Sequence, residues 1–153
     1  IRFKKGEDTY GQDGDIASTA PESKLFRDVF SIECKHYKDL QLWSMITNTK
    51  ESLFDFYKQT FRQAKNAKKL PFLIARQNYK PTLVLVPHIV SGYIYYSGVF
   101  EPKATFYHKK HTVDVYFYDD LLKMETVEFL RNIQRAKDNL EELLEEVFNN
   151  GHV

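Results

Sequence analysis

Polar and apolar residues are distributed along the chain in ways that predict four β-strands. Residues 29–37 and 112–118 alternate between apolar and polar side chains, which is the pattern of a half-buried strand. Residues 72–75 and 82–86 are continuous apolar runs, which predict two strands buried on both faces.

Two longer segments carry apolar residues every three or four positions and predict amphipathic helices. The first covers residues 50–69 and is ended by Pro71, and the second covers residues 125–149, with Gly151 as its stop. Between them, residues 88–111 fit either strands or an inserted loop. Strands interleaved with helices predict an α/β fold, with a mixed sheet flanked by helices and a long C-terminal helix.

The beginning of the chain is more polar and less regular. Residues 1–14 contain three glycines and predict a loop, residues 15–19 predict a short strand, and residues 20–23 predict a turn. The 153 residues are enough for one domain with a hydrophobic core, which we expect to span residues 1–153.

Composition excludes several classes of protein. With 42% hydrophobic and 28% charged residues, the chain is neither disordered nor collagen-like. Its longest apolar runs are far shorter than the roughly 18 residues that a membrane span needs. A single cysteine, Cys34, excludes an intramolecular disulfide or a zinc cluster built from cysteines, and no secretory or transit signal is visible. We therefore expect a cytoplasmic protein.

Charge is unevenly distributed, although the net charge is only +1. Residues 1–110 hold 18 basic and 11 acidic side chains, whereas residues 111–153 hold 4 basic and 10 acidic ones. This segregation fits one surface for a polyanion, and equally an ordinary solvated surface beside an acidic helix. The candidate residues for contact with a polyanion lie on the polar side of the first helix and near the N-terminus: Lys58, Arg62, Lys65, Lys69, Arg2, Lys4 and Lys5.

The candidate chemistry comes from two carboxylates and a lysine. Asp15 stands at the start of the first short strand, and Glu33 and Lys35 lie two positions apart on the next strand, so that they share a face. A hairpin between the two strands would bring Asp15 close to both. Two carboxylates offer hard oxygen ligands for Mg²⁺, and the lysine could orient or deprotonate a water, or neutralise charge on a phosphate.

An acid two residues before a lysine is not informative by itself. The chain contains three such triplets, beginning at Glu22, Glu33 and Glu101, which is about the number that its composition gives by chance. Glu22 lies in the predicted turn, and Pro102 interrupts the triplet of Glu101. Only Glu33 lies inside an apolar strand that is followed by a helix with a basic face.

These motifs resemble the PD-(D/E)XK nuclease superfamily, and within it the Holliday-junction resolvases of archaea and phages. The resemblance covers about residues 10–87 and rests on four segments: Gly14-Asp15-Ile16, Ile32-Glu33-Cys34-Lys35, Phe61-Arg62-Gln63-Ala64 and Leu70-Pro71-Phe72-Leu73-Ile74. It implies a restriction-endonuclease-like α/β fold and a metal-dependent endonuclease that cuts four-way junctions in DNA recombination. Related nucleases with restriction-like or fork and flap specificity, and a catalytically silent DNA-binding module, are the alternatives.

The resemblance also implies roles for individual residues. In that superfamily, the residues that match Asp15 and Glu33 bind a divalent metal, here Mg²⁺ or Mn²⁺, and the lysine that matches Lys35 is catalytic. The backbone carbonyl of the intervening residue, here Cys34, often completes the metal shell. Several members place a glutamine of the following helix near the site, and Gln63, which borders the apolar face, fits this role better than Gln59.

Two features of the chain depart from the superfamily pattern. Gly14 stands where a proline often precedes the first aspartate, a substitution common among resolvase-like members. The chain begins at Ile1, and the usual helix with a glutamate would have to precede it. Because a resolvase cuts two strands symmetrically, the resemblance further implies a homodimer, acting in the host cytoplasm if it is encoded by a phage.

Three other residue types have simpler interpretations. Trp43 could stack on an unpaired base, but a tryptophan between leucines is more often part of a core. His108 and His111 have a spacing that could bind metal, yet surface histidines fit better because no further ligands converge on them. We also expect the acidic C-terminal helix to lie away from nucleic acid.

Overall fold

The computed structural model describes residues 2–3, 16–17, 21–37, 53–94 and 101–149. Asp15, Lys4, Lys5 and Trp43 lie outside the described residues. Among the described helices, none is both long and apolar enough to cross a membrane.

A mixed sheet of five strands forms the centre of the fold. Its strands lie in the order β3-β4-β5-β7-β6. β3 and β4 are parallel, whereas all the other pairs are antiparallel. The strands are β3 (Phe30–Tyr37), β4 (Leu70–Gln77), β5 (Leu83–Pro87), β6 (Ala104–His108) and β7 (His111–Phe117).

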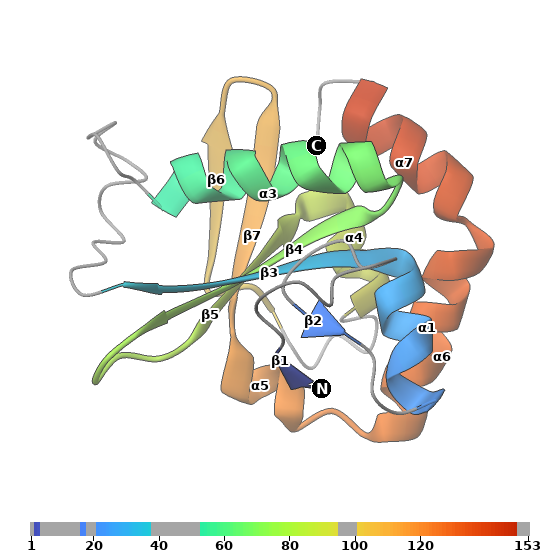
Figure 1. The fold of residues 1–153 in the computed structure, drawn as a ribbon, viewed down its shortest axis with the longest axis horizontal. Helices are drawn as coiled ribbons and strands as arrows, with labels where there is room; N and C mark the ends of the chain where they lie inside the picture. Colours follow the sequence, from blue (N-terminus) through green and yellow to red (C-terminus); the bar gives the residue numbers. More distant parts are fainter. Residues whose placement is uncertain (1, 4–15, 18–20, 38–52, 95–100, 150–153) are drawn as a thin grey trace.

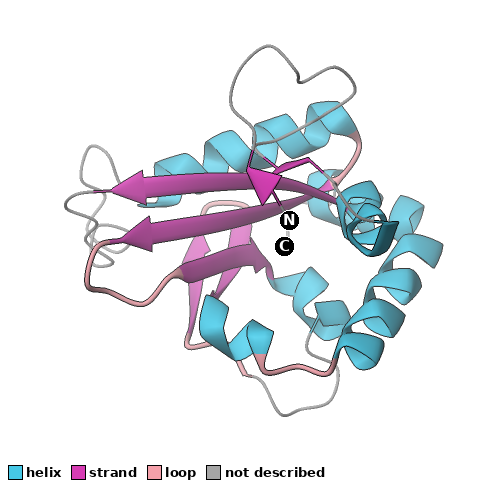
Figure 2. Cartoon of the chain, turned by 60° about the horizontal axis from the view of Figure 1, so that its bottom comes forward, coloured by secondary structure: helices cyan, strands magenta, loops and turns pink. Residues whose placement is uncertain are grey.

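Helices cover both faces of this sheet (Figure 1). α3 (Leu53–Ala67) connects the parallel strands β3 and β4 and lies over one face, while α1 (Pro21–Val29), α4 (His88–Ile94) and α6 (Thr126–Asp138) lie over the other. The short helix α5 (Tyr118–Leu122) follows β7, and α7 (Leu140–Asn149) ends the described chain. Viewed from another side, helices lie on both sides of the strands (Figure 2). The predicted α/β architecture is confirmed.

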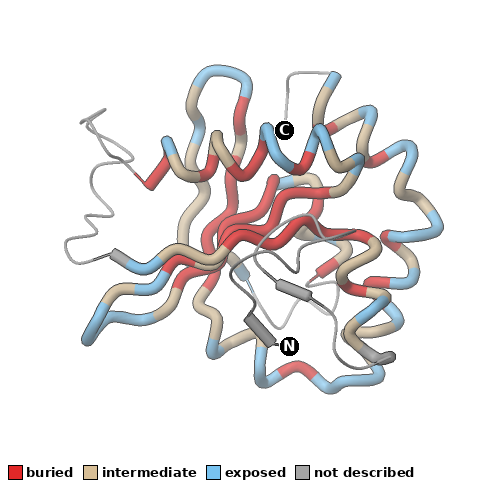
Figure 3. The backbone as a smooth tube through the Cα atoms, in the orientation of Figure 1, coloured by how far each residue is buried: buried red, intermediate tan, exposed pale blue. Residues whose placement is uncertain are grey.

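The core follows from the alternation of the strands and the apolar faces of the helices. On the α3 side, Tyr57 and Phe61 are buried against the sheet. On the other side, the ring of Phe26 in α1 packs against Phe30 of β3 and Phe72 of β4, with ring centroids 4.8 and 5.0 Å apart. β5 is buried along its whole length, as its apolar run predicts, and the buried positions run through the middle of the sheet (Figure 3).

The N-terminal part differs from the prediction. Arg2–Phe3 form a short strand, β1, which pairs antiparallel with β2 (Ile16–Ala17), so that these positions are not loop. Residues 21–23 of the predicted turn are instead the start of α1, which begins at Pro21. Proline suits the first turn of a helix, because its missing N–H would have no partner there.

The predicted C-terminal helix is two helices. α6 ends at Asp138 and α7 begins at Leu140, with Asn139 between them in a non-helical conformation (φ −110°, ψ 17°). The Asn139 side-chain amide donates a hydrogen bond to the carbonyl of Arg135, 2.8 Å away. Such a local side-chain bond competes with the helix and explains the break.

Candidate active site

The acid and the lysine of the predicted motif lie together on the edge strand β3. Lys35 Nζ is 3.1 Å from Glu33 Oε1. The strand alternates, so Phe30 and Ile32 are buried on the opposite face and Glu33 and Lys35 project on the α3 side. Glu33 is 6% exposed, whereas the Lys35 side chain is 29% exposed. The pair therefore reaches solvent through the lysine.

The surroundings of this pair fix its backbone firmly. β3 pairs in parallel with β4, which places Glu33 opposite Leu73 and Lys35 opposite Ala75, and both of these partners are buried. A buried carboxylate needs ionic or hydrogen-bonding partners, and the ammonium of Lys35 supplies one. The carboxylate oxygens of Glu33 are of the kind that a hard divalent cation takes as ligands, and the Lys35 ammonium lies 3.1 Å from one of them.

Asp15 cannot be compared directly with this pair, because it lies outside the described residues. The next residue, Ile16, begins β2, and β2 lies beside β3. The predicted hairpin between these two strands is wrong, since α1 separates them in sequence and β2 pairs with β1. The described part of the chain nevertheless carries β2 to the same edge of the sheet as Glu33.

Two further predicted residues take different positions. The side chain of Cys34 points to the opposite face of β3 and packs, half-buried, against the core, so only its backbone carbonyl is a candidate ligand. Gln63 is exposed, while Gln59 is half-buried. The buried face of α3 contains the five predicted residues and Phe54: Leu53, Phe54, Tyr57, Thr60, Phe61 and Ala64. Gln63 lies outside this face, and its role near the site stays a prediction.

The basic side chains of α3 lie on its outer surface. Arg62 and Lys65 are exposed, and Lys58 forms an ion pair with Asp55 at 3.1 Å. The β6–β7 turn adds Lys109 and Lys110, and Lys110 Nζ lies 5.7 Å from the centre of the Phe61 ring in α3. Two elements far apart in sequence thus form one basic surface.

The acidic helix α7 is close to this surface. The ring of Phe148 in α7 lies 4.7 Å from that of Phe61 in α3. α7 and α3 are therefore neighbours through an apolar contact. The expectation that the acidic helix lies away from nucleic acid stays a prediction.

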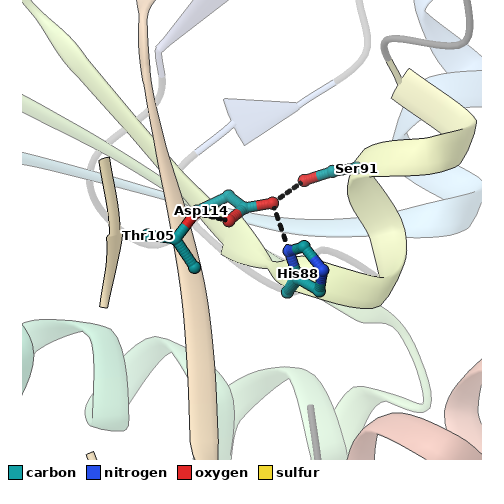
Figure 4. Close-up of polar contacts among 4 residues, drawn as sticks. All are labelled: His88, Ser91, Thr105 and Asp114. Atoms are coloured by element: carbon teal, nitrogen blue, oxygen red, sulfur yellow. Dashed lines mark hydrogen bonds and ion pairs between the residues drawn. The ribbon is translucent and has the colours of Figure 1, made fainter. Parts of the chain in front are cut away.

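Asp114 forms a second polar cluster, which sequence reasoning missed (Figure 4). This carboxylate is fully buried on β7 and accepts hydrogen bonds from Ser91 and from Thr105, the latter at 2.7 Å. His88 Nδ1 lies 2.9 Å from the same carboxylate, and the His88 side chain is 59% exposed. An aspartate inside an otherwise apolar strand is the signal that could have revealed the cluster, since a buried charge requires partners.

The hydrogen bonds of this cluster join separate elements of the fold, and we do not interpret it as a metal site. Its donors come from α4 and β6, so it ties the start of α4 to the centre of the sheet. Within the described ranges, no three histidine, cysteine or acidic residues gather closely enough to hold a metal ion. We interpret Asp114 as a structural clamp.

His111 is also buried, contrary to the expectation of a surface histidine. It packs among the rings of Phe54, Tyr57 and Phe61, with the Phe61 ring 4.6 Å away. Burial, with help from nearby Lys110, lowers the pKa of His111 to about 4. His111 is therefore neutral at pH 7 and belongs to the core.

Fold and motif together place the molecule in a known class. The mixed sheet, the helical connection between β3 and β4 and the acid-x-lysine strand at the sheet edge are those of a restriction-endonuclease-like fold. A family model described as "Phage putative PDDEXK endonuclease" matches residues 3–136, and the chain belongs to this family. The predicted superfamily is thus confirmed. No curated protein and no solved structure matches the chain.

Proposed function

We propose that this protein is a Mg²⁺-dependent DNA endonuclease that resolves four-way junctions. The observation that carries the proposal is the Glu33–Lys35 pair, 3.1 Å apart on the edge strand beside β2, in a member of a PDDEXK endonuclease family. PDDEXK nucleases generally depend on a divalent metal. Mn²⁺ is expected to substitute for Mg²⁺, because both accept carboxylate oxygens.

The proposed roles divide between ligands and a catalytic lysine. Asp15 and Glu33 supply carboxylate oxygens to the ion, and the backbone carbonyl of Cys34 supplies a third. A bound divalent ion contributes Lewis-acid activation of the scissile phosphate. The ammonium of Lys35, held beside Glu33, orients or deprotonates the attacking water, or offsets charge that develops on the phosphate. Gln63 assists on the side of α3.

The overall reaction is hydrolysis of a phosphodiester. The oxygen of water forms a new bond to phosphorus, one P–O ester bond breaks, and the departing oxygen takes up a proton. Arg62, Lys65 and Lys58 on α3, and Lys4 and Lys5 near the N-terminus, contact DNA phosphates in this proposal.

The proposed junction specificity also has a consequence for the oligomeric state. Symmetrical cutting of a four-way junction needs two active sites, so we propose a homodimer. The phage named in the family description supports a phage-encoded enzyme that works in the host cytoplasm. The competing possibilities are a nuclease of restriction-like or flap specificity and a module that binds DNA without cutting it.

The decisive experiment compares labelled four-way junction, flap and linear duplex in the presence of Mg²⁺, Mn²⁺ or EDTA. We expect junction cutting with either metal and none with EDTA. Asp15→Asn and Lys35→Ala should abolish cutting while junction binding persists. Lys24→Ala is the matched control and should cut normally, because Lys24 is an exposed lysine that also follows an acid by two positions.

Each alternative gives a different result in that experiment. If the enzyme cuts flap or duplex faster than the junction, the proposal of junction resolution is wrong and the protein is a nuclease of another specificity. Junction binding without cutting in either metal would favour the silent module, and full activity of Lys35→Ala would refute the role given to this lysine.

A further inference from the structure

The turn between β4 and β5 holds a tyrosine in an unfavourable backbone conformation. The Lys80 N–H donates to the Gln77 carbonyl at 3.3 Å, which closes a four-residue turn with Tyr79 in its third position. Tyr79 has a φ of 61°. This position normally takes glycine or asparagine, because a larger side chain there costs roughly 1–2 kcal/mol.

The side chain gains nothing in return from the fold. Tyr79 is 104% exposed, the highest value among the large hydrophobic side chains that the structure describes. An aromatic ring left in water at a strained position does not stabilise the monomer. A ligand that stacks on the ring would account for both the exposure and the strain.

The β4–β5 turn follows the end of β4 and is linked by a hydrogen bond to β3, the strand that carries Glu33 and Lys35. Asn78, the second residue of the turn, bonds through Oδ1 to His36 Nε2 at 3.0 Å, and His36 directly follows Lys35 on β3. Lys35 lies opposite Ala75 in β4, four residues before Tyr79. At about 3.3 Å per strand residue, the turn lies at most roughly 13 Å along the strand from the catalytic lysine.

Charge around the turn favours a nucleic acid. Arg76 and Lys80 are exposed on either side of Tyr79. Residues 56–100 contain no aspartate or glutamate. An exposed aromatic ring in a segment with exposed cations is the combination by which proteins hold unpaired bases and their flanking phosphates.

We propose that Tyr79 stacks on an unpaired or splayed base of branched DNA, and that Arg76 and Lys80 contact the adjacent phosphates. The inference rests on the proposed nuclease function and deepens it, since it identifies the residue that recognises the branch. Because the turn lies at most roughly 13 Å along the strand from Lys35, the stacked base is expected to lie a few nucleotides from the cut phosphate.

The test measures binding in EDTA, so that it does not depend on cutting. A four-way junction carries 2-aminopurine at its centre, and a linear duplex of the same sequence serves as reference. Tyr79→Ala should weaken junction binding about ten- to hundredfold and abolish quenching of the probe, with little change for duplex. Tyr79→Phe and Tyr79→Trp should retain both, because stacking needs the ring and not the hydroxyl.

Two controls separate stacking from other roles. Tyr107→Ala removes another exposed tyrosine, which lies on β6 outside this turn, and should leave the junction preference intact. Tyr79→Gly should raise the melting temperature, since it relieves the positive φ, while it weakens junction binding as Tyr79→Ala does.

Three results would overturn the inference: equal losses for junction and duplex, unchanged quenching in Tyr79→Ala, or equal effects of Tyr79→Ala and Tyr107→Ala. None of them would affect the nuclease proposal, which Lys35→Ala tests through cutting. Conversely, loss of quenching in Tyr79→Ala with no cutting by the wild type would leave branch recognition standing without the enzyme activity.

Discussion

Glu33 and Asp114 are both buried carboxylates on strands of the same sheet, but they are held in different ways. Asp114 lies in the sheet interior, and both of its oxygens accept hydrogen bonds from side chains of α4 and β6. Glu33 lies on the edge strand, and its ion pair is formed with a lysine two residues away on the same strand.

This difference separates a structural role from a chemical one. The partners of Asp114 are 9 to 26 residues distant in sequence, so their bonds hold separate elements together. The ion pair between Glu33 and Lys35 lies within one strand, so it does not join separate elements. The Lys35 side chain is partly exposed, so solvent reaches this end of the pair. We therefore expect mutations at Asp114 to affect stability and mutations at Glu33 to affect catalysis.

Glu33→Gln is expected to have the largest effect. The amide keeps the shape of the side chain but loses the charge that would hold a metal ion, so cutting should fall at least about 10²–10⁴-fold. The free energy of unfolding should change less than it does in Asp114→Ala, because the amide fills the same space and the Lys35 ammonium that loses its partner still reaches solvent. Measurements are the rate of junction cutting in Mg²⁺ and urea-induced unfolding.

Asp114→Ala should have the opposite profile. Three donors lose their acceptor, which is expected to lower the free energy of unfolding by about 2–4 kcal/mol. The melting temperature should fall by about 10 °C for a chain of this size. Thr105→Val, which removes one donor only, is the milder control. If Asp114→Asn stays folded but no longer cuts, the division between the two carboxylates is wrong.

Sequence reasoning succeeded where local patterns determine the structure. The strand predicted at residues 29–37 is β3 with one residue less, and alternation alone placed Glu33 and Lys35 on one face. It failed where contacts are distant: His88, Ser91 and Thr105 meet Asp114 through strand pairing and the placement of α4, which no local spacing encodes. α1 was missed because Pro21 suggests a turn as readily as a helix start.

His111 is a third buried titratable group, and unlike the carboxylates Glu33 and Asp114 it is buried in its neutral form. Its pKa of about 4 in the fold lies below the ordinary value near 6.5, so the unfolded chain binds the proton more readily. Stability from this residue is complete above pH 6.5 and declines as the pH falls toward 4, by up to about 3 kcal/mol. His111→Phe should unfold with a weaker pH dependence over this range. Identical pH profiles for the two proteins would contradict the burial of a neutral histidine.

The smallest effect concerns the face from which DNA approaches. If DNA lies on the α3 side, with Glu33 and Lys35, then Arg62→Ala combined with Lys65→Ala removes two phosphate contacts. The slope of log affinity against log salt should then become shallower by about 1.8, equally for every DNA sequence. Lys137→Ala on α6, over the opposite face and paired with Asp28, should leave the slope unchanged. A shallower slope in Lys137→Ala, with the α3 variant unaffected, would place DNA on the side of Asp114 and reverse the roles of the two carboxylates.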